Sequence, residues 1–136
     1  MIYLVEDDSS IRELVIYALN STGLEAKGFE KPSEFWKAVE EEEPSLVILD
    51  VMLPEESGID VLKKIRSNPA IEKLPVIMET AKTSEYDRIN GLESGADDYI
   101  SKPFSMMEMV ARVKALIRRS EYKHEEKDYT INNLYV

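Results

Sequence analysis

The chain contains no cysteine, so neither a disulfide framework nor a thiolate metal site is available to it. A cysteine-free composition suits a reducing cytosol, and we therefore expect a cytoplasmic protein. No apolar run approaches the roughly 18 residues of a membrane span, and acidic residues arrive too early for a signal peptide. Positive charge is also scarce, since 17 Lys and Arg residues against 27 Asp and Glu residues give a net charge of −10. We expect no membrane partner and no binding of nucleic-acid phosphates by this chain itself.

Short apolar runs alternate with helical patterns along the 136 residues. This alternation predicts parallel strands joined by right-handed helical crossovers. With helices on both faces, we expect an α/β fold of the flavodoxin-like (βα)5 kind, a doubly wound parallel sheet with strand order 2-1-3-4-5. The strands are predicted at 2–5, 26–29, 46–50, 76–78 and 98–101, and the helices begin near residues 9, 33, 57, 84 and 105.

The character of the chain changes after Arg119. Residues 120–128 are polar and charged, which predicts a linker, and 129–136 have the pattern of a new strand. We therefore expect one domain over residues 1–119. Residues 120–136 are interpreted as a linker and the start of a further C-terminal domain, so we expect the chain to be part of a longer protein.

Asp50 is the first candidate for a functional residue, because it ends a buried apolar run. Ligands of open parallel sheets bind outside the carboxyl edge, which is where this residue falls. Glu6 and Asp7 follow the first strand, Thr80 follows the fourth, and Lys102 follows the fifth. Three neighbouring carboxylates repel one another, and a divalent cation relieves that repulsion. Oxygen ligands of this kind favour Mg²⁺.

The same group of residues can bind a phosphoryl group. Lys102 supplies a second positive charge, and Thr80 supplies a hydroxyl donor beside the backbone N–H of Ala81. Together with the cation, these groups can contact the phosphoryl oxygens that do not react. Asp50 can then attack phosphorus and become an aspartyl phosphate.

These motifs resemble the receiver domain of the two-component response regulators. The match covers about residues 1–119, and several separate motifs fall in the family's order and spacing. Residues 95–104 and the last helix are most similar to the winged-helix transcription-factor (OmpR/PhoB-type) subclass. The matching stretches are 4–8, 46–54, Ser57-Gly58, 80–82, 95–99 and 102–104.

The resemblance implies a role for each residue of the acidic group. Asp50 would accept a phosphoryl group from a sensor histidine kinase, and Glu6 and Asp7 would form the acidic pocket. Mg²⁺ would be bound by Asp7, Asp50 and the backbone carbonyl of Met52. Lys102 would pair with the phosphate, and the peptide bond before Pro103 would be cis.

The resemblance also implies a switch. Thr80 would be the switch hydroxyl and Tyr99 the aromatic residue that responds to it, although Tyr99 could equally be a packing residue. Met52 and Lys82 occupy positions that tune hydrolysis of the acyl phosphate across the family. Neither is a carboxylate base, so we predict a phosphoryl group that lasts for minutes or more.

Receivers of this subclass form homodimers through the fourth helix, fifth strand and fifth helix. Complementary pairs between subunits, such as Arg88 with Glu108 and Asp98 with Arg112, would fix the register of such a dimer. The dimer would control an attached transcriptional effector domain, and any DNA contact would belong to that missing domain. The expected dimer face contains Arg88, Ile89, Leu92, Asp97, Asp98, Glu108, Arg112 and Arg119.

Other functions fit the sequence less well. A stand-alone receiver that docks to a partner protein remains an alternative. A phosphatase of the haloacid dehalogenase kind would need an aspartate two residues after the nucleophile, where this chain has Met52. A dinucleotide-binding domain would need a glycine-rich turn after the first strand. We therefore predict a signalling domain that catalyses only its own phosphorylation and slow dephosphorylation.

Glu79 departs from the family pattern, because an apolar residue is more usual just before the switch threonine. We expect this carboxylate to make the end of the fourth strand more hydrated than is typical.

Overall fold

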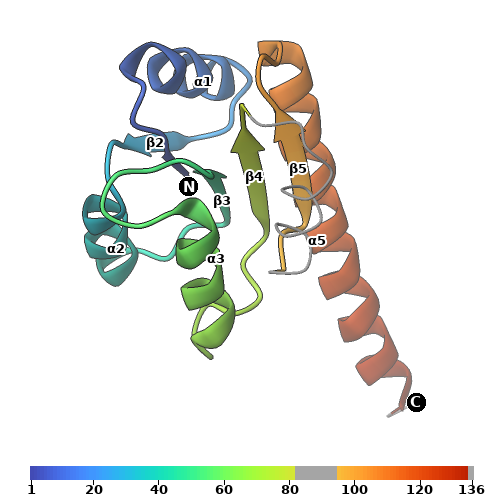
Figure 1. The fold of residues 1–136 in the computed structure, drawn as a ribbon. Coiled ribbons are helices and arrows are strands. Elements are labelled where there is room, and N and C mark those ends of the chain that lie inside the picture. Colours follow the sequence, from blue (N-terminus) through green and yellow to red (C-terminus); the bar gives the residue numbers. More distant parts are fainter. Residues whose placement is uncertain (82–94, 135–136) are drawn as a thin grey trace.

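The computed structural model describes residues 1–81 and 95–134, with side chains described up to residue 121. Five parallel strands form one sheet in the order β2-β1-β3-β4-β5, which confirms the predicted topology (Figure 1). The predicted helix at 84–94 lies outside the described residues. The described elements are β1 (Ile2–Val5), α1 (Ser9–Ser21), β2 (Ala26–Phe29), α2 (Pro32–Glu41), β3 (Leu46–Asp50), α3 (Gly58–Ser67), β4 (Val76–Thr80), β5 (Asp98–Ser101) and α5 (Met106–Leu134).

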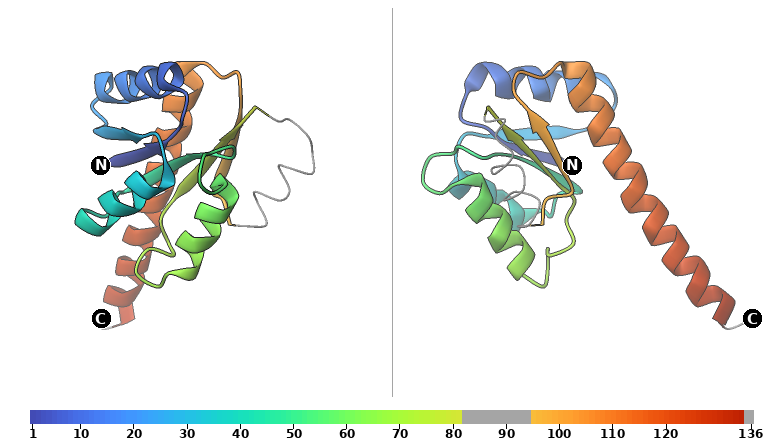
Figure 2. Two further views of the ribbon diagram at one scale, coloured as in Figure 1. Left: turned by 60° about the vertical axis from the view of Figure 1, so that its left-hand side comes forward. Right: turned by 45° about the vertical axis from the view of Figure 1, so that its right-hand side comes forward.

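Helices cover both faces of the sheet, and each face has its own hydrophobic core (Figure 2). Residues of α2 and α3 pack on one face, and residues of α1 and α5 pack on the other. Because both faces are covered, β1, β3 and β4 are buried along their whole length. This explains why these strands have continuous apolar runs in the sequence rather than alternating patterns.

The alternation of side chains along each strand decides which face a strand-end residue joins. Leu4, Ile48, Ile77 and Ile100 all belong to the core under α1 and α5. Residues two positions apart in a strand point to the same face. The polar residues two positions further along therefore extend this face at the carboxyl edge of the sheet, and they are Glu6, Asp50, Glu79 and Lys102.

Local capping interactions fix the starts of two helices. The Asp8 side chain accepts a hydrogen bond from the Ile11 N–H at 3.1 Å and caps α1. Ser57 caps α3 by accepting from the Asp60 N–H, also at 3.1 Å. α2 begins differently, because its N-cap residue is Lys31 and no side chain of that residue caps the helix.

The end of α5 differs from the sequence-based prediction. We expected a linker from Ser120 and a strand over 129–136, but α5 continues as one helix to Leu134. No glycine or proline interrupts residues 106–134, and glutamate and lysine favour a helix. The final turns extend beyond the sheet (Figures 1 and 2), so none of the described strands lies beside the apolar residues to pair with them. The domain boundary near residue 119 remains a prediction.

Candidate phospho-acceptor site

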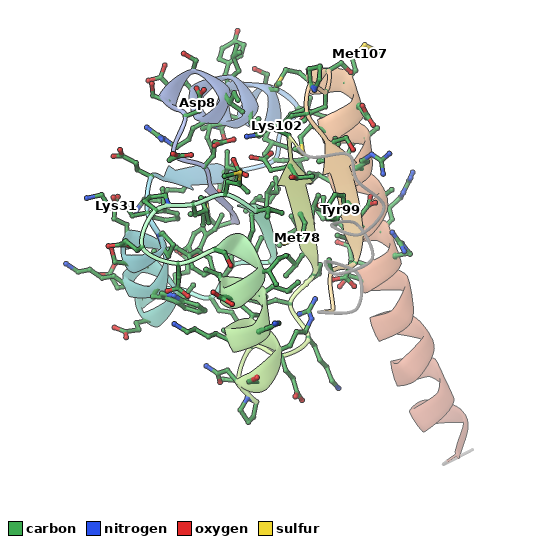
Figure 3. All side chains as sticks on the ribbon, viewed as in Figure 1. Asp8, Lys31, Met78, Tyr99, Lys102 and Met107 are labelled. Carbon is green, nitrogen blue, oxygen red and sulfur yellow. The ribbon has the colours of Figure 1, made fainter. Side chains whose placement is uncertain are left out.

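Lys102 joins two buried carboxylates at the carboxyl edge of the sheet. Its Nζ atom donates to Glu6 Oε1 and to Asp50 Oδ2, each at 2.6 Å. Glu6 is fully buried, and only 4 % of Asp50 is exposed. Figure 3 shows Lys102 at the upper end of the sheet, between α1 and the start of α5. The structure thus brings together residues from β3 and from the segments that follow β1 and β5, as the strand-end argument predicted.

Asp7 is exposed, but it belongs to the same acidic group. Carboxylate oxygens of Glu6, Asp7 and Asp50 lie within 4.8 Å of one another. Three oxygen donors at this spacing suit a hard divalent cation such as Mg²⁺. A hollow of about 630 Å³ opens beside Asp7 and is otherwise lined by residues 51–57. The donor set and the open space beside it therefore fit the cation that the sequence predicted.

Burial and crowding change the acid strength of Asp50. Burial, followed by the adjacent Glu6 carboxyl group, raises the pKa of Asp50 to about 6. Hydrogen bonds from Lys102 and from the Met52 N–H oppose that rise. Burial disfavours the charge on Lys102, but its hydrogen bonds to both carboxylates outweigh burial and raise its pKa. The site therefore keeps a firmly charged ammonium next to a carboxylate that lacks full compensation.

The backbone around Asp50 is fixed on both sides. The Val51 N–H donates to the Glu79 carbonyl at 2.9 Å, which extends the β3–β4 pairing past the strand. The Met52 N–H donates to Asp50 Oδ1 at 3.0 Å and orients that carboxylate. Gly58 packs so closely that a Cβ atom there would lie 2.0 Å from the Asp50 carbonyl oxygen. Only glycine fits at this position, which gives a physical reason for the Ser57-Gly58 motif.

The predicted switch residues lie on the last two strands. Thr80 is buried at the end of β4, and its carbonyl accepts from the Lys102 N–H at 2.7 Å. Tyr99 is 7 % exposed and belongs to the core on the α2 and α3 face. Met78 pairs with Tyr99 in register, so Thr80 lies two residues further along β4 on the same face. The exposed Ala81 follows, and the peptide bond between Lys102 and Pro103 is cis, as predicted.

Glu79 is a residue of this site whose placement we did not predict. Its side chain is fully buried, and neither carboxyl oxygen has a hydrogen-bond partner among the described residues. Burial, followed by the nearby Glu6 carboxyl group, raises the pKa of Glu79 well above its usual value. The expectation of a hydrated strand end is therefore wrong. The burial of Glu79 could have been predicted from the alternation of side chains along the strand, since Ile77, two residues earlier, points into the α1 and α5 core.

Charged residues of the predicted dimer face pair within the chain. Asp98 Oδ1 accepts from Arg112 at 2.9 Å, and Glu108 pairs with the same guanidinium at 3.2 Å. Asp97 pairs with Arg66 at 2.9 Å. The predicted intersubunit pair of Asp98 with Arg112 is therefore an intramolecular pair, because α5 packs beside β5. Four further predicted residues, Lys82, Arg88, Ile89 and Leu92, lie outside the described residues.

The fold and the site together define a signalling domain that carries an acidic pocket and a lysine at one sheet edge. A family model for the response regulator receiver domain matches residues 2–114. The chain belongs to this family. A receiver domain is a phospho-acceptor signalling module that works with a histidine kinase, not a conventional enzyme. The family match therefore supports the predicted signalling domain over the phosphatase.

Known transcriptional regulators and solved receivers are similar to this chain. Transcriptional regulatory protein GltR of Pseudomonas aeruginosa is 48% identical over 121 residues, which cover 89% of this chain and 50% of GltR. The phosphate regulon regulator PhoB of Escherichia coli is 44% identical over 118 residues, which cover 87% of this chain and 52% of PhoB. A putative response regulator from Chloroflexus aurantiacus has a TM-score of 0.82 at 32% identity, with coverage of 86% and 96%.

The chain spans about half the length of the curated relatives that it matches. These relatives confirm the resemblance to the OmpR/PhoB-type subclass. No helix in the part of the chain that the structure describes is long and apolar enough to cross a membrane.

Proposed function

We propose that Asp50 accepts a phosphoryl group from a sensor histidine kinase and that the receiver thereby switches an attached transcriptional effector domain. The position of Asp50 carries this proposal. Its two carboxylate oxygens are oriented by the Met52 N–H and by Lys102, and two further carboxylates lie within cation-binding distance. Such an arrangement places a nucleophile, a fixed positive charge and a cation site together.

The phosphoryl transfer follows from these contacts. An Asp50 oxygen attacks phosphorus while the bond between phosphorus and the kinase imidazole nitrogen breaks. The electron pair of that bond returns to the imidazole. Lys102, the Thr80 hydroxyl and the Ala81 N–H then contact the transferred phosphoryl oxygens. The protein supplies position and charge rather than a further reactive group.

A divalent cation completes the proposed site. Asp7, Asp50 and the Met52 carbonyl would hold Mg²⁺, with Glu6 beside them. When bound, Mg²⁺ neutralises negative charge on the carboxylates and on the phosphoryl oxygens.

The proposed switch uses Thr80 and Tyr99. Phosphate at Asp50 draws in the Thr80 hydroxyl, and Tyr99 moves into the space that is vacated. Their position on one face of adjacent strands supports this coupling. The phosphorylated state then favours a homodimer through the face of the predicted fourth helix, β5 and α5, as a shift between populations. DNA contact belongs to a C-terminal domain outside this chain, and the cysteine-free composition supports a cytoplasmic location.

Intact mass after incubation with acetyl phosphate and Mg²⁺ tests the central claim. We expect the wild-type protein to gain one phosphoryl group and the Asp50→Asn variant to gain none. The matched control is Asp60→Asn, which changes an exposed aspartate in the first turn of α3. Equal phosphorylation of the Asp50→Asn variant and the wild type would exclude Asp50 as the acceptor.

A further inference from the structure

The loop between β3 and α3 is attached to the start of α2. This loop, residues 51–57, carries the Met52 carbonyl and lines the hollow beside Asp7. At its tip, Glu55 Oε1 accepts from the Ser33 N–H at 2.9 Å, and Glu55 Oε2 accepts from the Ser33 hydroxyl at 3.1 Å. Figure 1 shows this loop, in green, curving toward α2 before the chain enters α3. The loop next to the phospho-acceptor is therefore tied to a helix 22 residues earlier in the chain.

Glu55 does for α2 what an N-cap side chain normally does. The actual N-cap residue, Lys31, makes no side-chain cap, so the carboxylate of Glu55 satisfies the free N–H of Ser33 instead. The hydrogen bonds from the Ser33 N–H and hydroxyl lower the pKa of Glu55, with a smaller contribution from nearby Lys31. The group is a carboxylate anion at the positive end of a helix, which is a favourable arrangement.

Glu55 has an unfavourable backbone conformation, which its contact with Ser33 helps to stabilise. Its φ of +68° lies in the left-handed region, which disfavours any residue with a Cβ atom. Glycine would adopt this conformation without strain. A glutamate in this conformation raises the free energy of the backbone. The two hydrogen bonds from Ser33 to the Glu55 side chain offset that cost.

Contacts of Glu56 and a backbone hydrogen bond between the two ends of the loop hold the rest of it. Glu56 accepts from Trp36 Nε1 at 3.3 Å and pairs with Lys64 at 3.0 Å, so it contacts both α2 and α3. At the base, the Gly58 N–H donates to the Val51 carbonyl at 2.9 Å. The Met52 carbonyl therefore lies on a short segment that is held at both ends.

We propose that Glu55 is a positioning residue for the phospho-acceptor site, because its contact with Ser33 holds the loop that presents the Met52 carbonyl to the cation. This inference rests on the proposed function of the site. Glu55 itself touches neither the cation nor the phosphoryl group. Its removal lowers the affinity for Mg²⁺ and leaves phosphoryl transfer intact once Mg²⁺ is saturating.

Mg²⁺ binding to the unphosphorylated protein, measured by titration calorimetry, tests this proposal. The Glu55→Gly variant removes the carboxylate and relieves the positive φ, so a loss of affinity cannot be attributed to backbone strain. We expect its dissociation constant for Mg²⁺ to rise about three- to tenfold, since the contact acts through the loop. Ser33→Ala removes only the hydroxyl and keeps the N–H, so its effect should be smaller.

The matched charge control compares Glu55→Gln with Glu30→Gln, an exposed glutamate close to the start of α2. Both variants lose one negative charge, but only the first changes the contact with Ser33. An equal loss of affinity in both variants would show a general charge effect and overturn the proposal. Wild-type affinity in Glu55→Gly would also overturn it. Circular dichroism confirms that each variant is folded.

Phosphorylation separates this inference from the proposed function. At saturating Mg²⁺, Glu55→Gly should be phosphorylated by acetyl phosphate at the wild-type rate, and at limiting Mg²⁺ more slowly. A phosphorylated wild type together with an unaffected Glu55→Gly variant at limiting Mg²⁺ refutes the positioning role alone. A wild type that is never phosphorylated at Asp50 refutes the proposed function, and Mg²⁺ binding to the unphosphorylated protein then still decides the positioning role.

Discussion

Replacing Glu79 by leucine is expected to stabilise this protein at neutral pH. Glu79 lies in β4 with its side chain fully buried, and its two carboxyl oxygens have no hydrogen-bond partner among the described residues. Its register partner in β5 is Ile100, and Ile77 lies two residues earlier on the same face. A leucine at position 79 would pack against these two apolar side chains, while Asp50 is its register partner on the other side, in β3.

The expected gain follows from the cost of the buried carboxyl group. A buried polar group without a partner costs about 1–3 kcal/mol. The interaction of the protonated Glu79 carboxyl group with Glu6 offsets part of that cost, and Glu79→Leu removes the remainder. For a domain of this size, 1 kcal/mol corresponds to a shift in Tm of about 4 °C. Glu79→Gln is the informative companion, because it keeps the unpartnered polar atoms and removes only the ionisation.

The pH dependence of unfolding separates the cost of burying the polar atoms of Glu79 from the cost of its ionisation. The pKa of Glu79 is raised above its usual value in the folded state, so the folded protein retains this proton at a pH where the unfolded chain has released it. The free energy of unfolding therefore falls as pH rises above the unfolded pKa, by at most about 1.4 kcal/mol per pH unit. Wild type and Glu79→Gln should unfold alike near the unfolded pKa, and Glu79→Gln should become the more stable of the two as pH rises.

Urea unfolding in EDTA, at about pH 5 and about pH 7.5, measures these differences for the wild type and both variants. Glu79→Leu should have a higher midpoint than the wild type at both pH values, with the larger difference at the higher pH. If both variants unfold at the wild-type midpoint at both pH values, Glu79 is not buried without a partner. A lower midpoint for Glu79→Leu at the higher pH would show that the carboxyl group makes a favourable contact.

Three further predictions concern the site. Asp50→Asn should raise the free energy of unfolding in EDTA by about 1–2 kcal/mol after allowance for solvent screening. Because the folded pKa of Asp50 is raised to about 6, this gain should be present at pH 7.5, shrink as pH falls below about 6, and vanish below the unfolded pKa. Met52 offers no carboxylate base to water, so the phosphoryl group should persist for minutes or more in isolated protein, and a half-life of seconds would contradict this. Thr80→Ala should be phosphorylated without dimerising, which sedimentation in the presence of beryllofluoride measures. A wild-type monomer under these conditions would contradict the proposed dimer. A normal dimer of the Thr80→Ala variant would contradict the proposed switch.

The candidate site could be predicted because its residues end apolar runs. Asp50 and Thr80 end short hydrophobic strands and Lys102 follows one, and parallel strands bring such ends to one edge. The distances from Lys102 to Glu6 and Asp50 agree with that prediction. The order of the strands could also be predicted, since the alternation of strands and helices leaves few permitted topologies.

Contacts between distant or non-periodic residues could not be predicted in this way. Nothing in the spacing of Ser33 and Glu55 marks them as partners, because one begins a helix and the other lies in a loop. Asp98 and Arg112 are complementary charges, and complementarity alone does not decide whether a pair forms within a chain or between chains. The apolar residues after Tyr129 resemble a strand locally, but a strand needs a neighbour and a helix does not.

The protonation state of the buried Glu79 affects the net charge of the site. Glu6, Asp7 and Asp50 as carboxylates, with Lys102 as an ammonium, carry three negative charges and one positive charge, which leaves two negative charges. One divalent cation balances that remainder. An ionised Glu79 would add a further negative charge in a position shielded from solvent, and no described residue donates a hydrogen bond to it. Burial raises the pKa of Glu79 and so favours its neutral form, which suits a site balanced by a single divalent cation. The pH dependence of the Glu79→Gln variant measures how strongly the fold favours that form.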